Sequence, residues 1–334
     1  PVPWMLHEKL AEMKAAGFRH IGHVAGLTPP SLSPWDINRE VIRAYQLDSE
    51  RPADDVMSSA ARRWVGSDFA ARLVDVWKIV QESIRAFPPP GLYSTWGMAW
   101  YKLWVRPLVP DIEAISEEDR AYYEEFLLAT PHNPNRVDLN MDILFELGGP
   151  ELAAKIVERT DTNTLPVAAR AVEKLKLILE DDAISADARK VFADLAFRIR
   201  GLEIWFTTQR NAQAWIAGVH GWLRTEDTNE RGRCRKLLDE MIDSEISNSE
   251  KLIELWNESS GSFMAVSDIG ESVHIHGDNL AEHLTKRLAL MKAHRNDVPR
   301  IDPDFIWRVP GLDFYSIDEM GPGVSPVTDQ LDNS

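Results

Sequence analysis

The stretch Trp4–Val24, WMLHEKLAEMKAAGFRHIGHV, decides how the chain begins to fold. Its first part, residues 4–16, predicts a helix, because apolar side chains recur at helical spacing at Leu6, Leu10 and Met13. Gly17 follows as a helix stop, and Phe18–Val24 then has the pattern of a short strand. A helix, a glycine and a short strand in this order make up half of an α/β unit.

A single strand lacks a hydrogen-bonding partner, so this α/β segment cannot stand alone. No second strand of the same unit follows in the sequence. The segment therefore pairs either with distant short strands or with the earlier strands of a (β/α)8 barrel, of which it is the last helix–strand unit. Under the second alternative residues 1–35 end a barrel-like domain, and Pro1, in place of Met, marks a processed end or a cut within a longer protein.

Helical patterns fill most of the remaining chain, beginning with a helix that has Ser33 as its predicted N-cap. Helices are predicted over 33–45, 52–65, 67–86, 116–129, 142–147, 150–159, 165–180, 185–223, 231–258 and 278–294. The two longest should pack antiparallel, because only the polar turn Thr225–Glu230 separates them. The predicted fold class is mainly α, a helical array over residues 36–300 with the short α/β segment before it and an extended C-terminal tail over 301–334.

An aromatic segment, Phe87–Pro110, is bounded by prolines at both ends. It contains five large flat side chains, Tyr93, Trp96, Trp100, Tyr101 and Trp104. One interpretation is a core plug between helices. The other is a stacking wall for a sugar ring, with Arg106 among the polar groups that would bind its hydroxyls. Under the second interpretation Trp96 and Trp100 are exposed, whereas Trp104, beside Val105, belongs to the core.

A polar loop covers residues 130–140, TPHNPNRVDLN. Its amide, guanidinium, imidazole and carboxylate groups are carried by His132, Asn133, Asn135, Arg136 and Asp138. This combination suits the recognition of hydroxyls or of a carboxylate, which an arginine can bind through two hydrogen bonds. The alternative is an ordinary loop whose polar side chains form turns and helix caps.

Histidines suggest two further candidate sites. His23 would face a binding site if it lay at the carboxyl end of a barrel strand, whereas His20 and His23 are three apart and make a poor metal pair. In VHIHGD, the side chains of His274, His276 and Asp278 alternate and could hold a divalent metal. We favour the alternative of surface histidines before a helix that Asp278 caps, and we assign no metal and no cofactor.

Charge and composition exclude several classes of function. The net charge of −16 argues against a nucleic-acid partner, whose phosphates require a basic face. No apolar run reaches the length of about 18 residues that a membrane span requires, so we predict no membrane partner. The single cysteine, Cys234, excludes an internal disulfide, and the composition fits a soluble protein of either the cytoplasm or the periplasm.

Several stretches of the sequence resemble a known family. They are GFRHIGHVAGLTPPSLSPWDIN from Gly17, NREVIRAYQLDSERPADDVMSSAARRWVG from Asn38, LWVRPLVP, HNPNRVDLNMDILFELGG, and HGDNLAEHLTKRLALMKAHRNDVPRID from His276. Together they are similar to the C-terminal part of bacterial (β/α)-barrel glycoside hydrolases of the α-glucuronidase-like kind. The resemblance implies that the catalytic carboxylates lie on earlier barrel strands, so no catalytic residue is assigned in this sequence. It also implies that the aromatic segment and the polar loop lie near the mouth of the site.

Two functions therefore remain open. The first is the helix-rich C-terminal part of a carbohydrate-active enzyme, which braces the barrel, binds a carbohydrate ligand and takes part in the hydrolysis of O-glycosyl bonds when the catalytic barrel is present. The alternative is a stand-alone helical scaffold or interaction protein without catalysis. Both are compatible with a homo-oligomer.

Overall fold

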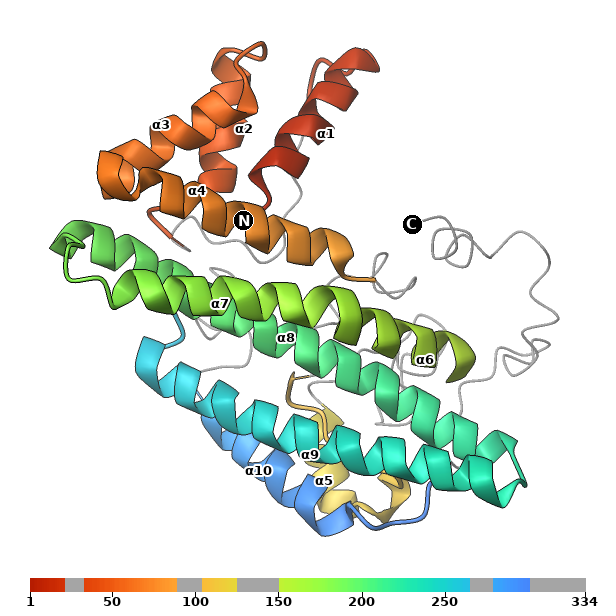
Figure 1. Cartoon of the computed structure of the whole chain (residues 1–334). Helices are drawn as coiled ribbons and strands as arrows, with labels where there is room; N and C mark the ends of the chain where they lie inside the picture. Colours follow the sequence, from red (N-terminus) through yellow and green to blue (C-terminus); the bar gives the residue numbers. More distant parts are fainter. Residues whose placement is uncertain (22–32, 89–103, 125–149, 265–278, 301–334) are drawn as a thin grey trace. The chain divides into compact units, whose positions relative to one another are not determined.

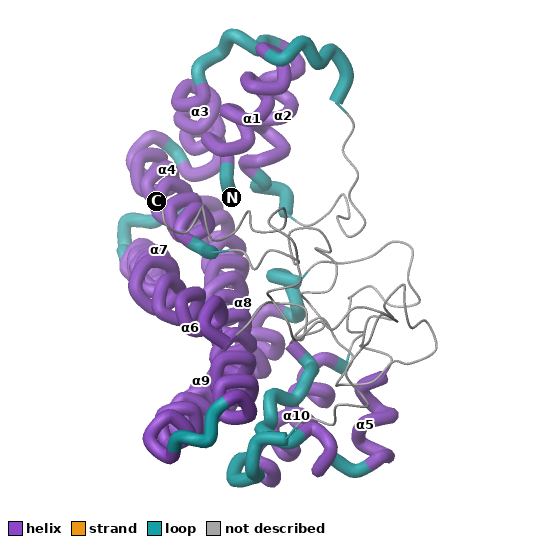
Figure 2. The backbone as a smooth tube through the Cα atoms, turned by 90° about the vertical axis from the view of Figure 1, so that its right-hand side faces the viewer, coloured by secondary structure: helices purple, strands orange, loops and turns teal. Residues whose placement is uncertain are grey.

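A computed structural model describes residues 1–21, 33–88, 104–124, 150–264 and 279–300 of the protein (Figure 1). As predicted, the described residues are mainly helical, and none of them forms a strand (Figure 2). None of the described helices combines the length and the apolar character that crossing a membrane would need. The chain divides into two compact units, which we describe separately.

Unit 1 comprises Pro1–Phe87, Asp161–Phe206 and Glu254–Asn279. It contains α1 (Pro3–Ala15), α2 (Ile37–Leu47), α3 (Ala53–Val65), α4 (Ser67–Ala86), α7 (Leu165–Leu179) and the first part of α8 (Ala186–Arg224). Helices α3 and α4 meet at Gly66, whose φ of +78° is accessible to glycine at little cost. The predicted end of one helix and start of the next are both confirmed there.

The core of unit 1 is apolar. Helix α4 supplies Leu73, Val76 and Val80, all 0% exposed and three or four residues apart, so that they share one face of the helix. Met57 from α3 and Phe192 from α8 are also fully buried in this cluster. Each such side chain contributes about 1.5–3 kcal/mol to folding, so this face alone accounts for the position of α4.

Helices α1 and α2 run parallel to each other. Near their first turns, Val2 N donates to Asn38 Oδ1 at 2.9 Å, and further along Tyr45 Oη donates to Leu10 O at 3.2 Å. At their last turns, Lys14 Nζ donates to Ser49 Oγ at 2.7 Å. The first turns of α1 and α2 therefore lie side by side, and so do their last turns. The chain between these helices must travel back along their full length.

The start of α2 differs from the prediction. Asp36, not Ser33, is its N-cap, with the Asp36 carboxylate accepting from Asn38 N at 2.9 Å. The hydroxyl of Ser33 instead donates to Asp194 Oδ2 at 2.8 Å and accepts from Trp35 N at 3.1 Å. The prediction was wrong because this long-range bond to α8 leaves Ser33 in a turn ahead of the helix.

The end of α1 follows the prediction, but the strand after it does not. Gly17 has a φ of +88°, and Phe18 N donates to Met13 O at 3.0 Å, so the helix ends at the glycine as expected. Of the predicted strand Phe18–Val24, residues 18–21 are described, and they are irregular. Phe18 is 58% and Ile21 37% exposed, because no described strand pairs with this segment.

Unit 2 comprises Pro88–Thr160, Thr207–Ile253 and Leu280–Ser334. Its described elements are η2 (Ile112–Ala114), α5 (Glu117–Glu124), α6 (Pro150–Arg159), the second part of α8, most of α9 (Thr228–Ser259) and α10 (Leu280–His294). The π-helical turn η5 (Thr160–Thr164) joins α6 to α7, just before Pro166, a residue that cannot donate a backbone hydrogen bond.

Within unit 2, α8 and α9 pack antiparallel, as predicted from the short turn between them. Thr208 contacts Glu245, whereas Gly218, further along α8, lies against Leu238, earlier in α9. The approach at Gly218 is close, since a Cβ atom added there would lie 2.6 Å from the Leu238 side chain. Residues 211–220 of α8 are all buried, so this part of the helix is covered on every side.

Candidate functional site

Most of the predicted site residues lie outside the described part of the chain. They are His23, Tyr93, Trp96, Trp100, Tyr101, His132, Asn133, Asn135, Arg136 and Asp138, together with the metal candidates His274, His276 and Asp278. Their roles therefore stay predictions. Elsewhere, the described residues contain no group of three or more acidic, histidine or cysteine side chains placed to hold a metal ion.

Two of the residues singled out in the aromatic segment are described, Trp104 and Arg106. Trp104 is 7% exposed, which confirms its predicted place in the core. Arg106 is 1% exposed, and its carbonyl oxygen accepts from Arg287 Nε at 2.6 Å. The backbone of Arg106 is thus tied to a buried polar cluster, and its predicted contact with a sugar stays a prediction.

That cluster centres on Glu245 of α9. Its carboxylate is 0% exposed and accepts from Thr208 Oγ1 at 2.8 Å, from Asn211 Nδ2 at 2.7 Å and from Arg287 Nη1 at 2.7 Å. Asn248 Nδ2 donates to the Thr208 hydroxyl at 3.0 Å. Side chains of α8, α9 and α10 therefore converge on one buried anion.

The buried ion pair has a structural role. Glu245 and Arg287 are both withdrawn from water, which costs several kcal/mol for each ion unless hydrogen bonds and the opposite charge offset it. Here the carboxylate accepts from three side chains, and the guanidinium also donates to Ser249 and the Arg106 carbonyl, while its Nη2 has no hydrogen-bond partner among the described residues. Because a substrate could not reach this carboxylate without unpacking three helices, we exclude it as a catalytic group.

A histidine further along α8 has a strongly shifted protonation equilibrium. His220 of α8 is 8% exposed, and its ring stands edge-on to Trp215 with centroids 6.0 Å apart. Burial, followed by the nearby charge of Arg224, lowers the pKa of His220 to about 4. Burial opposes the charged form, so His220 is neutral at pH 7 and belongs to the packed interior.

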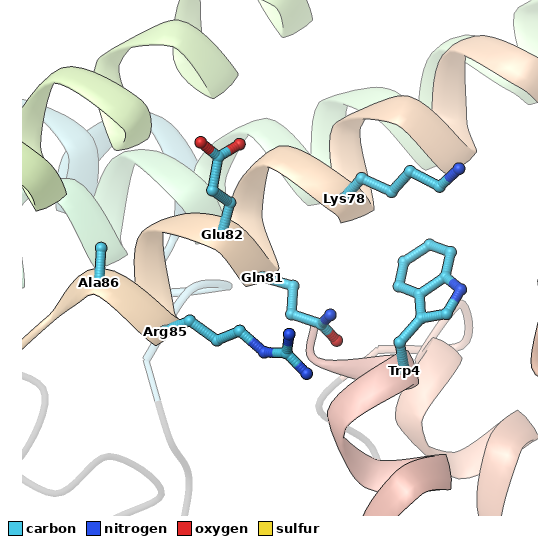
Figure 3. A pocket seen from close by; sticks show the side chains of 6 residues that line it. All are labelled: Trp4, Lys78, Gln81, Glu82, Arg85 and Ala86. Carbon is cyan, nitrogen blue, oxygen red and sulfur yellow. The ribbon is translucent and has the colours of Figure 1, made fainter. Parts of the chain in front are cut away.

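The candidate ligand site among the described residues is a hollow of 610 Å³ in unit 1. It lies between the first turn of α1 and the last turns of α4 (Figure 3). The described residues that line it are Trp4, Lys78, Gln81, Glu82, Arg85 and Ala86. One aromatic ring and several charged or polar groups thus border a space within the size range of small-molecule sites.

Hydrogen bonds fix most of the side chains around the hollow. Trp4 Nε1 donates to Asp54 Oδ1 at 2.8 Å, which sets the direction of the indole. Gln81 is 8% exposed, and its Oε1 accepts from Met5 N at 2.9 Å. Helix α4 places residues 78, 81, 82 and 85 along one side, because they are three and four apart.

Two of the charged side chains at the rim of the hollow form ion pairs, and a third does not. Glu82 and Arg170 form an ion pair at 2.5 Å, and Arg85 and Glu8 form another at 2.9 Å. Lys78 Nζ lies 5.7 Å from the centre of the Trp4 ring, a cation–π distance, and has no carboxylate partner within the described residues. The hollow can bind and orient a ligand, but its described groups offer no acid–base or nucleophilic pair.

Sequence reasoning did not find this hollow. Trp4 was simply the start of a predicted helix, and Lys78, Glu82 and Arg85 belong to another, the helix predicted over 67–86. The two sides meet only through the tertiary packing of α1 on α4, for which the sequence carries no local pattern. Comparison of the chain with protein-family profiles, curated protein sequences and solved structures gives no match.

Proposed function

We propose that the chain is the helix-rich C-terminal part of a carbohydrate-active enzyme, a glycoside hydrolase of the (β/α)-barrel class. The observation that supports this is the parallel arrangement of α1 and α2. In a (β/α) barrel, each outer helix is followed by an inner strand and then by the next outer helix, so neighbouring helices run parallel. Two helices joined by a short turn would instead run antiparallel.

The length of the connection fits this arrangement. Helix α2 has 11 residues and spans about 16 Å at 1.5 Å per residue. A strand over Phe18–Val24, of which residues 18–21 are described and irregular, would span about 23 Å at 3.3 Å per residue if it paired with other barrel strands, enough to return along α1. The exposed side chains of Phe18 and Ile21 fit a terminal strand whose partners belong to another part of the barrel.

The carbohydrate contacts in this proposal come from the aromatic segment and the polar loop. Trp96 and Trp100 would stack on the apolar face of a sugar ring, while Asn133, Asn135 and Arg136 would bind its hydroxyls. The catalytic carboxylates would lie on the strands that precede this sequence in the barrel. In isolation the chain would therefore bind carbohydrate without hydrolysing it.

A titration with xylo-, gluco- and manno-oligosaccharides tests the binding role. The 12 tryptophans give indole N–H signals in a two-dimensional NMR spectrum, and Trp96→Phe and Trp100→Phe identify two of them. We expect one oligosaccharide series to shift these two signals and Trp96→Ala to weaken binding about tenfold, as loss of a stacking ring does. Absence of any shift would contradict the carbohydrate role and favour the scaffold alternative.

A second measurement tests the location of the catalytic residues. Aryl glycosides release a coloured phenol on hydrolysis, so activity of the chain by itself can be measured directly. We expect none. Turnover by the isolated chain would place the catalytic groups inside this sequence and would refute the proposal that they lie on other strands.

A further inference from the structure

The groups around the unit 1 hollow point to a ligand of one charge sign. Gln81 is more than nine-tenths buried, and its only acceptor atom, Oε1, is occupied by Met5 N. Within the described residues its amide nitrogen has no hydrogen-bond partner, and it is directed into the space beside Trp4 (Figure 3). This N–H is open to the hollow, so a ligand that accepts from it would replace a hydrogen bond to water.

The cations at the rim add to this preference. The ammonium of Lys78 is a donor only, and the guanidinium of Arg85 keeps further N–H groups besides the one that Glu8 occupies. The acid in the lining, Glu82, is neutralised by Arg170. The free donors that face a ligand are thus the Gln81 amide, the Lys78 ammonium and the remaining N–H groups of Arg85.

The negative charge of the whole chain does not cancel this local field. At physiological ionic strength the screening length is about 8 Å, so distant carboxylates have little effect inside the hollow. At the hollow itself, Arg85 and Glu82 are each in an ion pair, so Lys78 is the lining cation that has no carboxylate partner among the described residues and acts at contact distance. The net charge of −16 therefore allows an anion to bind here, although it disfavours one elsewhere on the surface.

The Trp4 indole favours a ligand with a flat apolar group. Trp4 borders the hollow with an apolar ring that is held in place by Asp54. A flat apolar group can pack against this ring while an attached carboxylate accepts from Gln81 and Lys78. We propose that the hollow between α1 and α4 is a binding site for a small aromatic carboxylate, a function distinct from the carbohydrate binding proposed above and independent of it.

Benzoate is the probe for this site, and benzyl alcohol is the control of the same shape without charge. The indole N–H signal of Trp4 can be assigned with Trp4→Phe and then followed in the intact chain. We expect benzoate to shift it saturably, with a dissociation constant of about 1 mM, the affinity that a ligand of this size reaches. Benzyl alcohol should shift it far less at equal concentration.

Two variants test the assigned contacts. Gln81→Glu keeps an oxygen for Met5 N but replaces the free donor with a negative charge, so benzoate should bind at least tenfold more weakly. Lys78→Gln should weaken binding about fivefold, the effect of losing one exposed charge contact. Lys236→Gln on α9 is the matched control, because it removes an exposed lysine charge from unit 2 and should change nothing.

The inference fails if 20 mM benzoate leaves the Trp4 signal unmoved in the unsubstituted protein. It also fails if benzyl alcohol shifts the signal as strongly, or if Gln81→Glu and Lys78→Gln bind benzoate as well as Lys236→Gln does. Circular dichroism and the remaining indole signals report whether each variant is folded. All these readouts concern Trp4 alone, so their failure leaves the carbohydrate proposal untouched.

Discussion

The two units differ in what they bury. The interior of unit 1 is built from aliphatic and aromatic side chains such as Leu73, Val80 and Phe192, and its ion pairs lie at the surface. The interior of unit 2 holds a carboxylate and a guanidinium, Glu245 and Arg287, in a network of hydroxyls and amides. The helices of one chain are thus held together in two ways, by apolar packing in unit 1 and by a buried network of charges and hydrogen bonds in unit 2.

The two kinds of interior differ in how strictly they fix the positions of the helices. Apolar side chains of similar volume can replace one another at modest cost, so an apolar core fixes the helices mainly by shape. A buried ion pair tolerates no shift of its helices, because a displaced partner leaves a charge without compensation. We infer that the register of α8, α9 and α10 is set by hydrogen bonds, whereas that of α3, α4 and α7 is set by packing.

The largest effect is expected from separating the buried charges. Glu245→Leu leaves Arg287 charged and without its counter-ion, and should lower the free energy of unfolding by about 3–5 kcal/mol in urea denaturation. The double variant Glu245→Leu, Arg287→Leu removes both charges and should recover most of this loss. If the double variant is no more stable than the single one, the charge pair is not what holds unit 2 together.

A cavity in unit 1 should have a similar but somewhat smaller effect. Leu73 is 0% exposed, and Leu73→Ala should cost about 3 kcal/mol in the same assay, from lost apolar burial and the cavity left behind. Leu177→Ala is the control, since Leu177 in the same unit is 58% exposed. A loss of less than 1 kcal/mol at Leu73 would mean that the apolar core is not tightly packed.

The pH dependence of stability provides a third test, specific to unit 2. The pKa of His220 is about 4 in the folded chain and about 6.5 when unfolded, so the unfolded state binds more protons between these values. Stability therefore falls as the pH is lowered from about 6.5 to 4, by about 3 kcal/mol at most for this group. His220→Phe should remove that part of the decrease, and an unchanged pH profile would show that His220 is not buried neutral.

The smallest effect should come from the residue next to Arg287. Lys286 Nζ lies 3.0 Å from Asp119 Oδ1 and 3.8 Å from the centre of the Tyr122 ring, and both charged partners are partly exposed. Lys286→Gln should cost no more than about 1 kcal/mol, and 1 M salt should reduce the difference. A cost equal to that of Glu245→Leu would abolish the distinction between the buried and the surface charge.

The helices were largely predictable from the sequence because their signals are local. The predicted 67–86 and 150–159 coincide with α4 and α6, and the glycine stops at Gly17 and Gly66 are both present. The start of α2 was not predictable, because Ser33 is drawn into a turn by Asp194, far away in the sequence. Ser33 and Asp36 can both cap a helix, and the hydrogen bond between Ser33 and Asp194 leaves Asp36 as the N-cap.

The buried pair and the hollow were not predictable for the same reason. Among 53 acidic residues nothing in the sequence distinguishes Glu245, and its burial depends on Thr208, Asn211 and Arg287 arriving from other elements. Gln81 sits within a helix that was predicted correctly, but its amide became part of a binding hollow only when α1 packed beside it. Local sequence patterns predict helices, whereas these sites form only when the helices pack together.

The close packing of α8 on α9 has a practical consequence for labelling. A Cβ atom at Gly221 would lie 2.9 Å from Cys234 Sγ, so the sulfur is held against the neighbouring helix. Burial raises the pKa of the Cys234 thiol, and the thiolate that maleimides attack is correspondingly scarce at neutral pH. Because the sequence contains no other cysteine, a cysteine introduced at an exposed position should react faster with a maleimide than the native thiol does.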